Sequence, residues 1–130
     1  MNNTQKLLDL AKKASENAYA PYSKFHVGAC ILTDTQHFYC GCNVENVSFP
    51  VGSCAETGAI AAMVSGGDKI INEILIYAPS KDLIYPCGAC RQRIAEFSNS
   101  KTLIHLADNT GIKKTHTINE LLPYSFKEFR

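Results

Sequence analysis

The sequence Pro86-Cys87-Gly88-Ala89-Cys90 is the segment around which the predicted fold is organised. Pro86 leads into a helix predicted over residues 87–98, so both cysteines stand in its first turn. Side chains three residues apart share one helix face, and two thiolates on one face can bind a single ion. Unpaired amides and the positive end of the helix dipole also favour thiolates at this position. We therefore predict a metal site at the start of this helix.

A second segment, Ser53-Cys54-Ala55-Glu56, begins another predicted helix, over residues 54–65. Cys54 offers a third sulfur, and three protein ligands leave the fourth tetrahedral position to water, which is typical of catalytic zinc. Bound zinc lowers the pKa of that water towards ~7, and Glu56 is then placed to act as the catalytic proton carrier. The sequence predicts one Zn²⁺ per subunit, held by Cys54, Cys87 and Cys90, in the pattern of the zinc deaminases that act on nucleobases.

Other interpretations of these residues stay open at this level. Cys87 and Cys90 alone fit a redox pair, although the chain lacks a thioredoxin-like pattern. Ser53 and Glu56 have the spacing of a helix capping box. A zinc-stabilised interaction module without enzymatic activity would need a fourth ligand, and Cys42 is the spare cysteine for that role. Three cysteines have no ligand spacing and are interpreted as small buried hydrophobic residues: Cys30, Cys40 and Cys42.

Hydrophobic periodicity outward from these two segments predicts one domain, residues 1–130. Further helices are expected from about residue 4 to before Pro21, and briefly after Thr117. Apolar alternation and β-branched runs predict strands at 25–32, 37–43, 71–78, 101–107 and 112–117. The order is α-β-β-α-β-α-β-β, for which a three-layer α/β/α sandwich with a five-stranded mixed sheet is the simplest architecture.

The composition of the chain excludes several classes of protein. It has 130 residues, 45% hydrophobic and 19% charged, which is typical of a single globular domain. A net charge of +1 argues against nucleic-acid binding through phosphate neutralisation. No apolar run reaches the ~20 residues of a membrane span, and the polar N-terminus lacks the order of a secretory signal. We expect a cytoplasmic protein whose six cysteines are reduced or metal-bound.

The chain resembles the short, homotetrameric cytidine deaminases over nearly its whole length. Five segments carry the resemblance: Ala20-Pro21-Tyr22-Ser23-Lys24-Phe25, Gly41-Cys42-Asn43-Val44-Glu45-Asn46, Cys54-Ala55-Glu56, Pro86-Cys87-Gly88-Ala89-Cys90-Arg91-Gln92 and Leu121-Leu122-Pro123-Tyr124-Ser125-Phe126. The resemblance implies a cytidine-deaminase-like fold, a homotetramer and a small nucleoside as partner, rather than nucleic acid or a membrane. It also implies hydrolytic deamination of cytidine, deoxycytidine or both, with release of ammonia, in pyrimidine salvage.

The resemblance further implies which residues bind the substrate. Phe25 would pack against the nucleoside, the Ala55 amide would contact the base carbonyl, and Phe126 would reach a neighbouring subunit's site. Asn43 and Glu45 would hydrogen-bond the ribose hydroxyls. Alternate residues of a strand point the same way, so an amide and a carboxylate can converge on a diol. The alternative role of Asn43 and Glu45 is to cap a turn at the strand end.

Two positions depart from the family pattern. The family often has arginine directly after the Cys-Ala-Glu triplet, where this chain has Thr57, and tyrosine is usual where it has Phe49. Zinc with three thiolates carries a net charge of −1, which makes its water less acidic unless other charges offset it. Two helix N-termini offer part of that compensation. The Thr57 hydroxyl, Arg91 or another cation is left to supply the rest.

Three rival functions follow from the same motifs. A deaminase of blasticidin-type nucleosides shares the zinc motifs, but that family lacks the Asn-x-Glu pair present here at Asn43 and Glu45. Polynucleotide-editing deaminases usually insert a helical crossover between the fourth and fifth strands, whereas 108–111 permits only a tight antiparallel return. The third rival is the interaction module with a closed zinc site.

Overall fold

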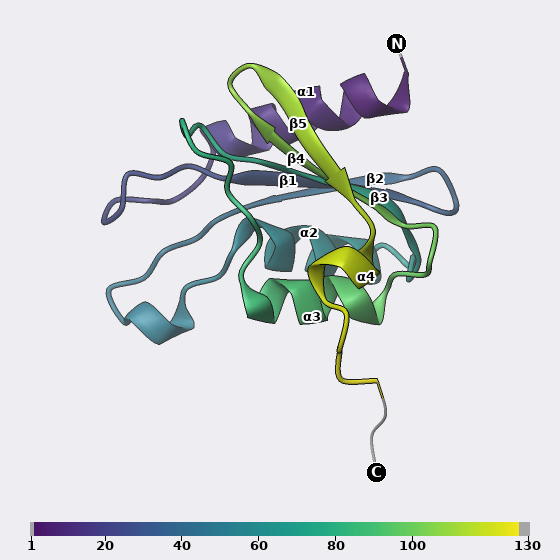
Figure 1. Cartoon of the computed structure of the whole chain (residues 1–130). Helices are drawn as coiled ribbons and strands as arrows, with labels where there is room; N and C mark the ends of the chain where they lie inside the picture. Colours follow the sequence, from purple (N-terminus) through teal and green to yellow (C-terminus); the bar gives the residue numbers. More distant parts are fainter. Residues whose placement is uncertain (1, 128–130) are drawn as a thin grey trace.

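A computed structural model describes residues 2–127, and its elements follow the predicted order. The helices are α1 (Asn3–Glu16), a 3₁₀ turn η1 (Phe49–Val51), α2 (Ala55–Ser65), α3 (Gly88–Glu96) and α4 (Ile118–Leu121). The strands are β1 (Gly28–Thr33), β2 (Phe38–Cys42), β3 (Ile71–Tyr77), β4 (Leu103–Asp108) and β5 (Gly111–His116). In Figure 1, α1 lies on one face of the sheet, and α2, α3 and α4 lie on the other. The predicted three-layer α/β/α sandwich is confirmed.

The five strands form one mixed sheet in the order β2-β1-β3-β4-β5. Strand β1 pairs antiparallel with both β2 and β3, β3 and β4 run parallel, and β4 and β5 are antiparallel. The return between β4 and β5 is tight: Asp108 pairs with Gly111, whose φ of 117° is a conformation that glycine adopts easily. The predicted antiparallel return is therefore confirmed, and no helical crossover separates the fourth and fifth strands.

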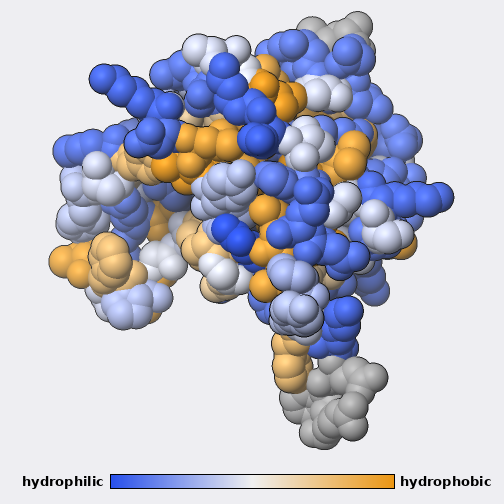
Figure 2. Space-filling model, in the orientation of Figure 1, coloured by the Kyte–Doolittle hydropathy of each residue, from blue (hydrophilic) through white to orange (hydrophobic). Residues whose placement is uncertain are grey.

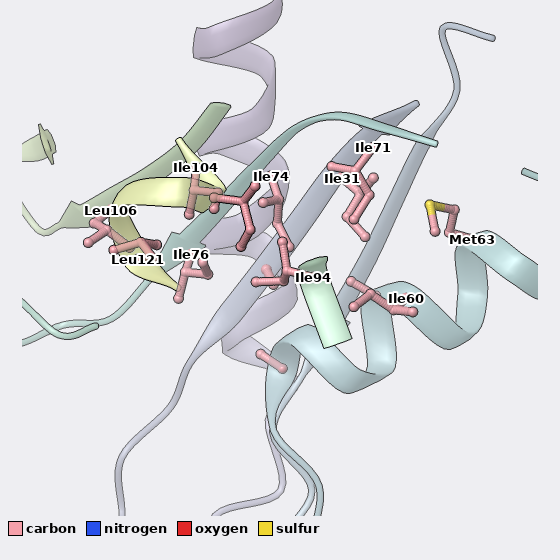
Figure 3. Packing of buried hydrophobic residues seen from close by; sticks show 14 residues of the cluster. Ile31, Ile60, Met63, Ile71, Ile74, Ile76, Ile94, Ile104, Leu106 and Leu121 are labelled. Atoms are coloured by element: carbon pink, nitrogen blue, oxygen red, sulfur yellow. The ribbon is translucent and has the colours of Figure 1, made fainter. Parts of the chain in front are cut away.

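Two hydrophobic clusters hold the layers together, one on each face of the sheet. Alternate residues of β3 divide between them. Ile74 and Ile76 belong to the cluster between the sheet and helices α2 and α3, whereas Leu75 and Tyr77 belong to the cluster between the sheet and α1. Figure 3 shows the first cluster, in which Ile94 of α3 lies among the isoleucines of the strands. Full burial of each such side chain stabilises the fold by roughly 1.5–3 kcal/mol. The described helices include none that is long and apolar enough to cross a membrane.

The strand predicted over residues 25–32 begins only at Gly28. The Val27 amide donates to Asn43 Oδ1 at 2.9 Å, and Asn43 Nδ2 donates to the Phe25 carbonyl at 2.8 Å. The Asn43 side chain, with one further bond from its backbone amide to the Val27 carbonyl at 3.3 Å, therefore takes the place of a regular strand partner along this segment. Hydrophobic alternation does not reveal which backbone groups pair, and the prediction from sequence therefore began the strand three residues too early.

A glycine brings strand β2 against helix α2. A Cβ added at Gly41 would lie 2.3 Å from the Ala59 nitrogen and 2.5 Å from the Ala55 carbonyl oxygen, far inside van der Waals contact. Only glycine permits the two backbones to come this close. This contact fixes the position of the first turn of α2 relative to the sheet.

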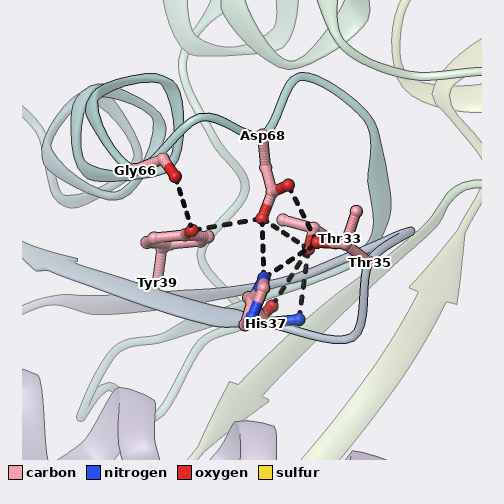
Figure 4. Close-up of polar contacts among 6 residues, drawn as sticks. All are labelled: Thr33, Thr35, His37, Tyr39, Gly66 and Asp68. Atoms are coloured by element: carbon pink, nitrogen blue, oxygen red, sulfur yellow. Dashed lines mark hydrogen bonds and ion pairs between the residues drawn. The ribbon is translucent and has the colours of Figure 1, made fainter.

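The C-terminal end of α2 is tied to the β1–β2 hairpin through Asp68 (Figure 4). Its carboxylate accepts hydrogen bonds from Thr35 Oγ1 at 2.8 Å, Thr33 Oγ1 at 3.0 Å and the Tyr39 hydroxyl at 3.1 Å, and lies 3.2 Å from His37 Nδ1. The bond from Thr35 contributes most to lowering the pKa of Asp68, and the other partners act in the same direction. The folded protein therefore favours the ionised form of this carboxyl.

We expect Asp68→Asn to lower the melting temperature at pH 7 by roughly 5 °C, because the buried Thr33 hydroxyl and the half-buried Tyr39 hydroxyl lose an ionised acceptor. A pKa that is lower in the folded state contributes stability above the unfolded pKa of about 3.9, and that contribution is lost as pH falls through the folded value. The difference between wild type and variant should thus shrink between pH 6 and pH 3 in thermal unfolding. Asp82→Asn, at an exposed loop position, is the control; a difference that stayed constant with pH would contradict the assignment.

Candidate metal centre

The sheet topology brings the first turns of α2 and α3 to one edge of the sheet. Because β1 is antiparallel to both β2 and β3, these two strands run in the same direction and end at the same edge. Helix α2 follows β2 along the chain and α3 follows β3, so both helices start there. Figure 1 shows the two helices lying together beneath the sheet. Segments far apart in the sequence thus meet through their N-termini.

Cysteines occupy the cap positions of both helices. Cys54 is the N-cap of α2, and Cys87 is the N-cap of α3. The Cys87 sulfur accepts the amide of Cys90 at 3.5 Å, and Cys90 is fully buried one turn into the helix. The placement of all three cysteines at helix starts is as the sequence predicted.

The three sulfurs of Cys54, Cys87 and Cys90 lie within 4.8 Å of one another. Two sulfurs bound tetrahedrally to one zinc ion at about 2.3 Å are separated by roughly 3.8 Å, so this cluster fits a single zinc ion. Within residues 2–127 the cluster contains no fourth ligand, and Cys42 does not belong to it. The closed zinc site of an interaction module therefore finds no support in the part of the chain that the structure describes.

The three thiols differ in how readily they ionise. Hydrogen bonding from the backbone amide of Cys90 lowers the pKa of Cys87, as the helix-start position predicted. Partial burial of the sulfur raises the pKa of Cys54, and burial followed by the negative charge of Glu56 raises that of Cys90. Three thiolates therefore need a cation among them, and metal binding should release protons.

Glu56 is the second residue of α2 and is only 5% exposed. Burial raises the pKa of its carboxyl, whereas its own backbone amide and the positive charge of Arg93 oppose the rise. A carboxyl whose pKa is raised holds a proton more readily and is suited to accept one and return it. The capping-box interpretation of Ser53 and Glu56 is wrong, because the helix begins one residue later, with Cys54 as its cap.

A cleft of about 240 Å³ opens beside the cysteines. Its lining includes Cys54, Ala55, Glu56 and Cys87, together with Asn43, the residue that follows β2. An adjoining cleft of about 220 Å³ shares Asn43 and Cys54 and includes Glu45. The two clefts, which share Asn43 and Cys54, are together called the hollow. Six of the nine predicted site residues border it, and Cys90 is buried: Asn43, Glu45, Cys54, Ala55, Glu56 and Cys87.

Glu45 also holds the segment before β1 in place. Its carboxylate accepts the amides of Tyr22 at 3.0 Å and Ser23 at 3.1 Å, and it accepts the Ser23 hydroxyl. These bonds, the Ser23 hydroxyl first, lower the pKa of Glu45 and keep it ionised. The polar groups of Glu45, like those of Asn43, thus brace residues 22–27 around the hollow. A carboxylate has about four acceptor positions, so Glu45 keeps capacity for a ligand.

The two predicted aromatic contacts lie outside the hollow of this chain. Phe25 is not among the residues that line either cleft. Phe126 is 69% exposed and borders a separate hollow of about 330 Å³ beside α3 and α4. Its backbone exchanges two hydrogen bonds with the Gln92 side chain, at 3.0 and 3.1 Å. The substrate contact predicted for Phe126 is therefore not made within one chain.

Two arginines of α3 have different roles. Arg91 donates to the carbonyl oxygens of Pro86 and Leu121, both at 2.8 Å, and so ties the start of α3 to α4. Arg93 instead places Nη1 3.7 Å from the Cys90 sulfur. Sequence reasoning considered Arg91 and missed Arg93, although the spacing of three residues between Cys90 and Arg93 was a signal that could have found it.

Comparison with known proteins gives a consistent result. Residues 1–106 match the family model described as the cytidine and deoxycytidylate deaminase zinc-binding region. A cytidine deaminase of Sporosarcina psychrophila is 40% identical over 126 residues, covering 97% of this chain and 93% of that protein. The crystal structure of a cytidine deaminase from Burkholderia pseudomallei superposes with a TM-score of 0.88 at 34% identity, covering 97% of this chain and 100% of the other. A blasticidin-S deaminase of Bacillus cereus is more distant, 32% identical over 135 residues, covering 96% and 95%.

We expect Cys87→Ala to abolish stoichiometric zinc binding, because two sulfurs no longer complete a site with three protein ligands. Zinc content of the purified protein, measured by elemental analysis, should fall from about one ion per chain to below ~0.1, a loss that fits the affinity carried by one ligand. Cys42→Ala is the matched control and should keep full zinc content. Full occupancy in Cys87→Ala would contradict the ligand set.

Proposed function

We propose that this chain, which belongs to the cytidine and deoxycytidylate deaminase family, is a zinc-dependent enzyme. It would convert cytidine, deoxycytidine or both to the corresponding uridine. Water replaces the 4-amino group of the base, and ammonia is released. The observation that carries this proposal is a buried carboxyl, Glu56, beside a three-cysteine cluster in one cleft.

Cys54, Cys87 and Cys90 would hold the zinc ion, leaving one coordination position open to solvent. When bound, zinc supplies the Lewis acidity that makes a water molecule nucleophilic near neutral pH. Because Cys54 and Cys87 are the N-caps of α2 and α3, the amide-rich ends of both helices lie beside the sulfur cluster and favour negative charge on it.

Glu56 would move the protons of the reaction. Its carboxylate takes a proton from the attacking water and delivers it to ring nitrogen N3, which makes C4 electrophilic. It then takes the proton of the hydroxyl group now on C4 and transfers it to the amino group. The C4–N bond breaks, ammonia rather than an amide anion leaves, and C4 keeps the oxygen as a carbonyl. Both transfers suit a carboxyl whose pKa is raised by burial, because it can hold the proton between the two steps.

Substrate recognition would use the remaining residues of the hollow, together with Phe25, which is not among the residues that line it in this chain. Asn43 and Glu45 are proposed to bind the ribose hydroxyls, the Ala55 amide the base carbonyl, and Phe25 the face of the nucleoside. Support comes from the position of Asn43 and Glu45, which border the hollow next to Cys54. Contact with a 3′-hydroxyl would serve both cytidine and deoxycytidine.

A homotetramer is part of the proposal, with Phe126 completing the site of a neighbouring chain. Exposed apolar side chains support it. Val47 and Phe49, around η1, are 84% and 86% exposed, and Tyr124 is 95% exposed near the C-terminus. Figure 2 shows apolar side chains on the protruding loop that carries η1, and large apolar groups of this kind mark interaction surfaces. We further propose that the enzyme acts in the cytoplasm, in pyrimidine salvage, where the thiols that zinc requires stay reduced.

Deamination of a blasticidin-type nucleoside is a second candidate, favoured by the relative from Bacillus cereus. Asn43 and Glu45 at the hollow favour a ribose-bearing substrate instead. Ammonia release from cytidine, deoxycytidine, cytosine and blasticidin S separates these functions. Turnover of blasticidin S without turnover of either pyrimidine nucleoside would overturn the primary proposal.

We expect Glu56→Gln to lose at least ~10²-fold in kcat while keeping zinc, because glutamine preserves the shape of the side chain but cannot take up and release a proton. Uridine formation and zinc content are the two measurements. Glu96→Gln removes an exposed carboxylate of α3 and should leave both unchanged. Near-normal turnover in Glu56→Gln would remove this residue from the mechanism.

Because Phe126 is proposed to complete the site of a neighbouring chain, oligomers that mix two variants test this role. Phe126→Ala should lower kcat/KM by roughly tenfold, the size of one lost apolar contact of ~1.4 kcal/mol. Tetramers assembled from Glu56→Gln and Phe126→Ala chains should be more active than either parent, since some sites then combine both native residues. Mass measured by light scattering should equal four chains. Mixed oligomers no more active than the average of their parents would place Phe126 outside the neighbouring site.

A further inference from the structure

We propose that Arg93 supplies the positive charge that compensates the three cysteine thiolates when they hold a metal ion, so that zinc affinity depends on it. This inference rests on the proposed function only in taking zinc as the metal. It adds a residue that the motifs of the chain do not include. It also explains how the site can hold three thiolates although the neutral Thr57 stands where the family often has arginine.

The position of Arg93 on α3 carries the proposal. It follows Cys90 by three residues, so both side chains lie on the same helix face. Its Nη1 is 3.7 Å from the Cys90 sulfur, within hydrogen-bonding distance for sulfur. One cation thus reaches a sulfur of the cluster that would hold the metal ion.

The charges of the site favour such a cation. Zn²⁺ with three thiolates has a net charge of −1, and Glu56 adds a second negative charge, in a buried position, in the form that accepts a proton. Each helix N-terminus offers the equivalent of about half a positive charge, so α2 and α3 together offset only about one. A remaining buried charge is costly unless it is paired. Arg93 brings the total close to neutral.

No alternative cation reaches the sulfurs among the described residues. Arg91 is bound to the carbonyl oxygens of Pro86 and Leu121. Thr57 stands three residues after Cys54, as Arg93 does after Cys90, but its side chain is neutral. Within residues 2–127, the only arginine or lysine that donates a hydrogen bond to a cluster sulfur is Arg93. The positive charge that the family often places on the helix of Cys54 would therefore be supplied here by α3.

The test compares the zinc dissociation constants of Arg93→Gln and Arg93→Lys with that of the wild type, by competition with a chromophoric chelator. We expect Arg93→Gln to weaken zinc binding about 3- to 10-fold, the size of a partly exposed charge-assisted hydrogen bond. Arg93→Lys keeps the charge and should stay within about twofold of wild type. Raising the salt concentration should narrow the difference in zinc affinity between wild type and Arg93→Gln, because this arginine is exposed to solvent.

Lys101→Gln removes an exposed charge outside the site and should leave zinc affinity unchanged. Adding Thr57→Arg to Arg93→Gln returns a cation one turn from Cys54 and should recover affinity, with circular dichroism confirming that each variant is folded. Wild-type affinity in Arg93→Gln, or an equal loss in Arg93→Lys, would overturn the proposal. Because zinc affinity is measured without turnover, failure of the deaminase assignment would leave this result unaffected.

Discussion

The convergence of three cysteine sulfurs from two helix starts is the constraint on which the rest of this structure depends. Sulfurs within 4.8 Å of one another cannot all ionise without a cation, and a cation held there needs the helices fixed relative to each other. The fold meets this need through topology, since two strands that run in the same direction deliver both helices to one edge of the sheet. The arrangement of strands and helices therefore positions the three sulfurs.

Helix α2 is restrained at both ends. At its start, the close backbone contact at Gly41 holds it against β2 and sets the depth of Cys54 and Glu56 relative to the sheet. Beyond its end, Asp68 binds hydroxyl groups of the β1–β2 hairpin. A catalytic carboxyl must keep its position within a fraction of an ångström to transfer protons efficiently. Two anchors on one short helix satisfy that requirement.

The polar residues at the rim of the hollow combine structural and functional roles. Asn43 takes the place of a strand partner for residues 25–27, and Glu45 fixes the turn that precedes them. The wall of the hollow is thus held by the same groups that are proposed to recognise the sugar. Preorganised groups of this kind cost little further ordering when a ligand binds. The two interpretations that the sequence allowed for this pair are therefore compatible.

The sequence by itself determined the order of elements and pointed to the three-cysteine cluster and to the glutamate proposed as proton carrier, because spacing of three along a helix and apolar periodicity are local properties of the chain. It also determined the tight β4–β5 return. Only the tertiary structure decided that the strand before Gly28 is replaced by Asn43 contacts, that Cys54 rather than Ser53 caps α2, and that Arg93 rather than Arg91 reaches a sulfur. These outcomes depend on which groups from distant segments meet in space, and periodicity along one segment carries no record of such partners.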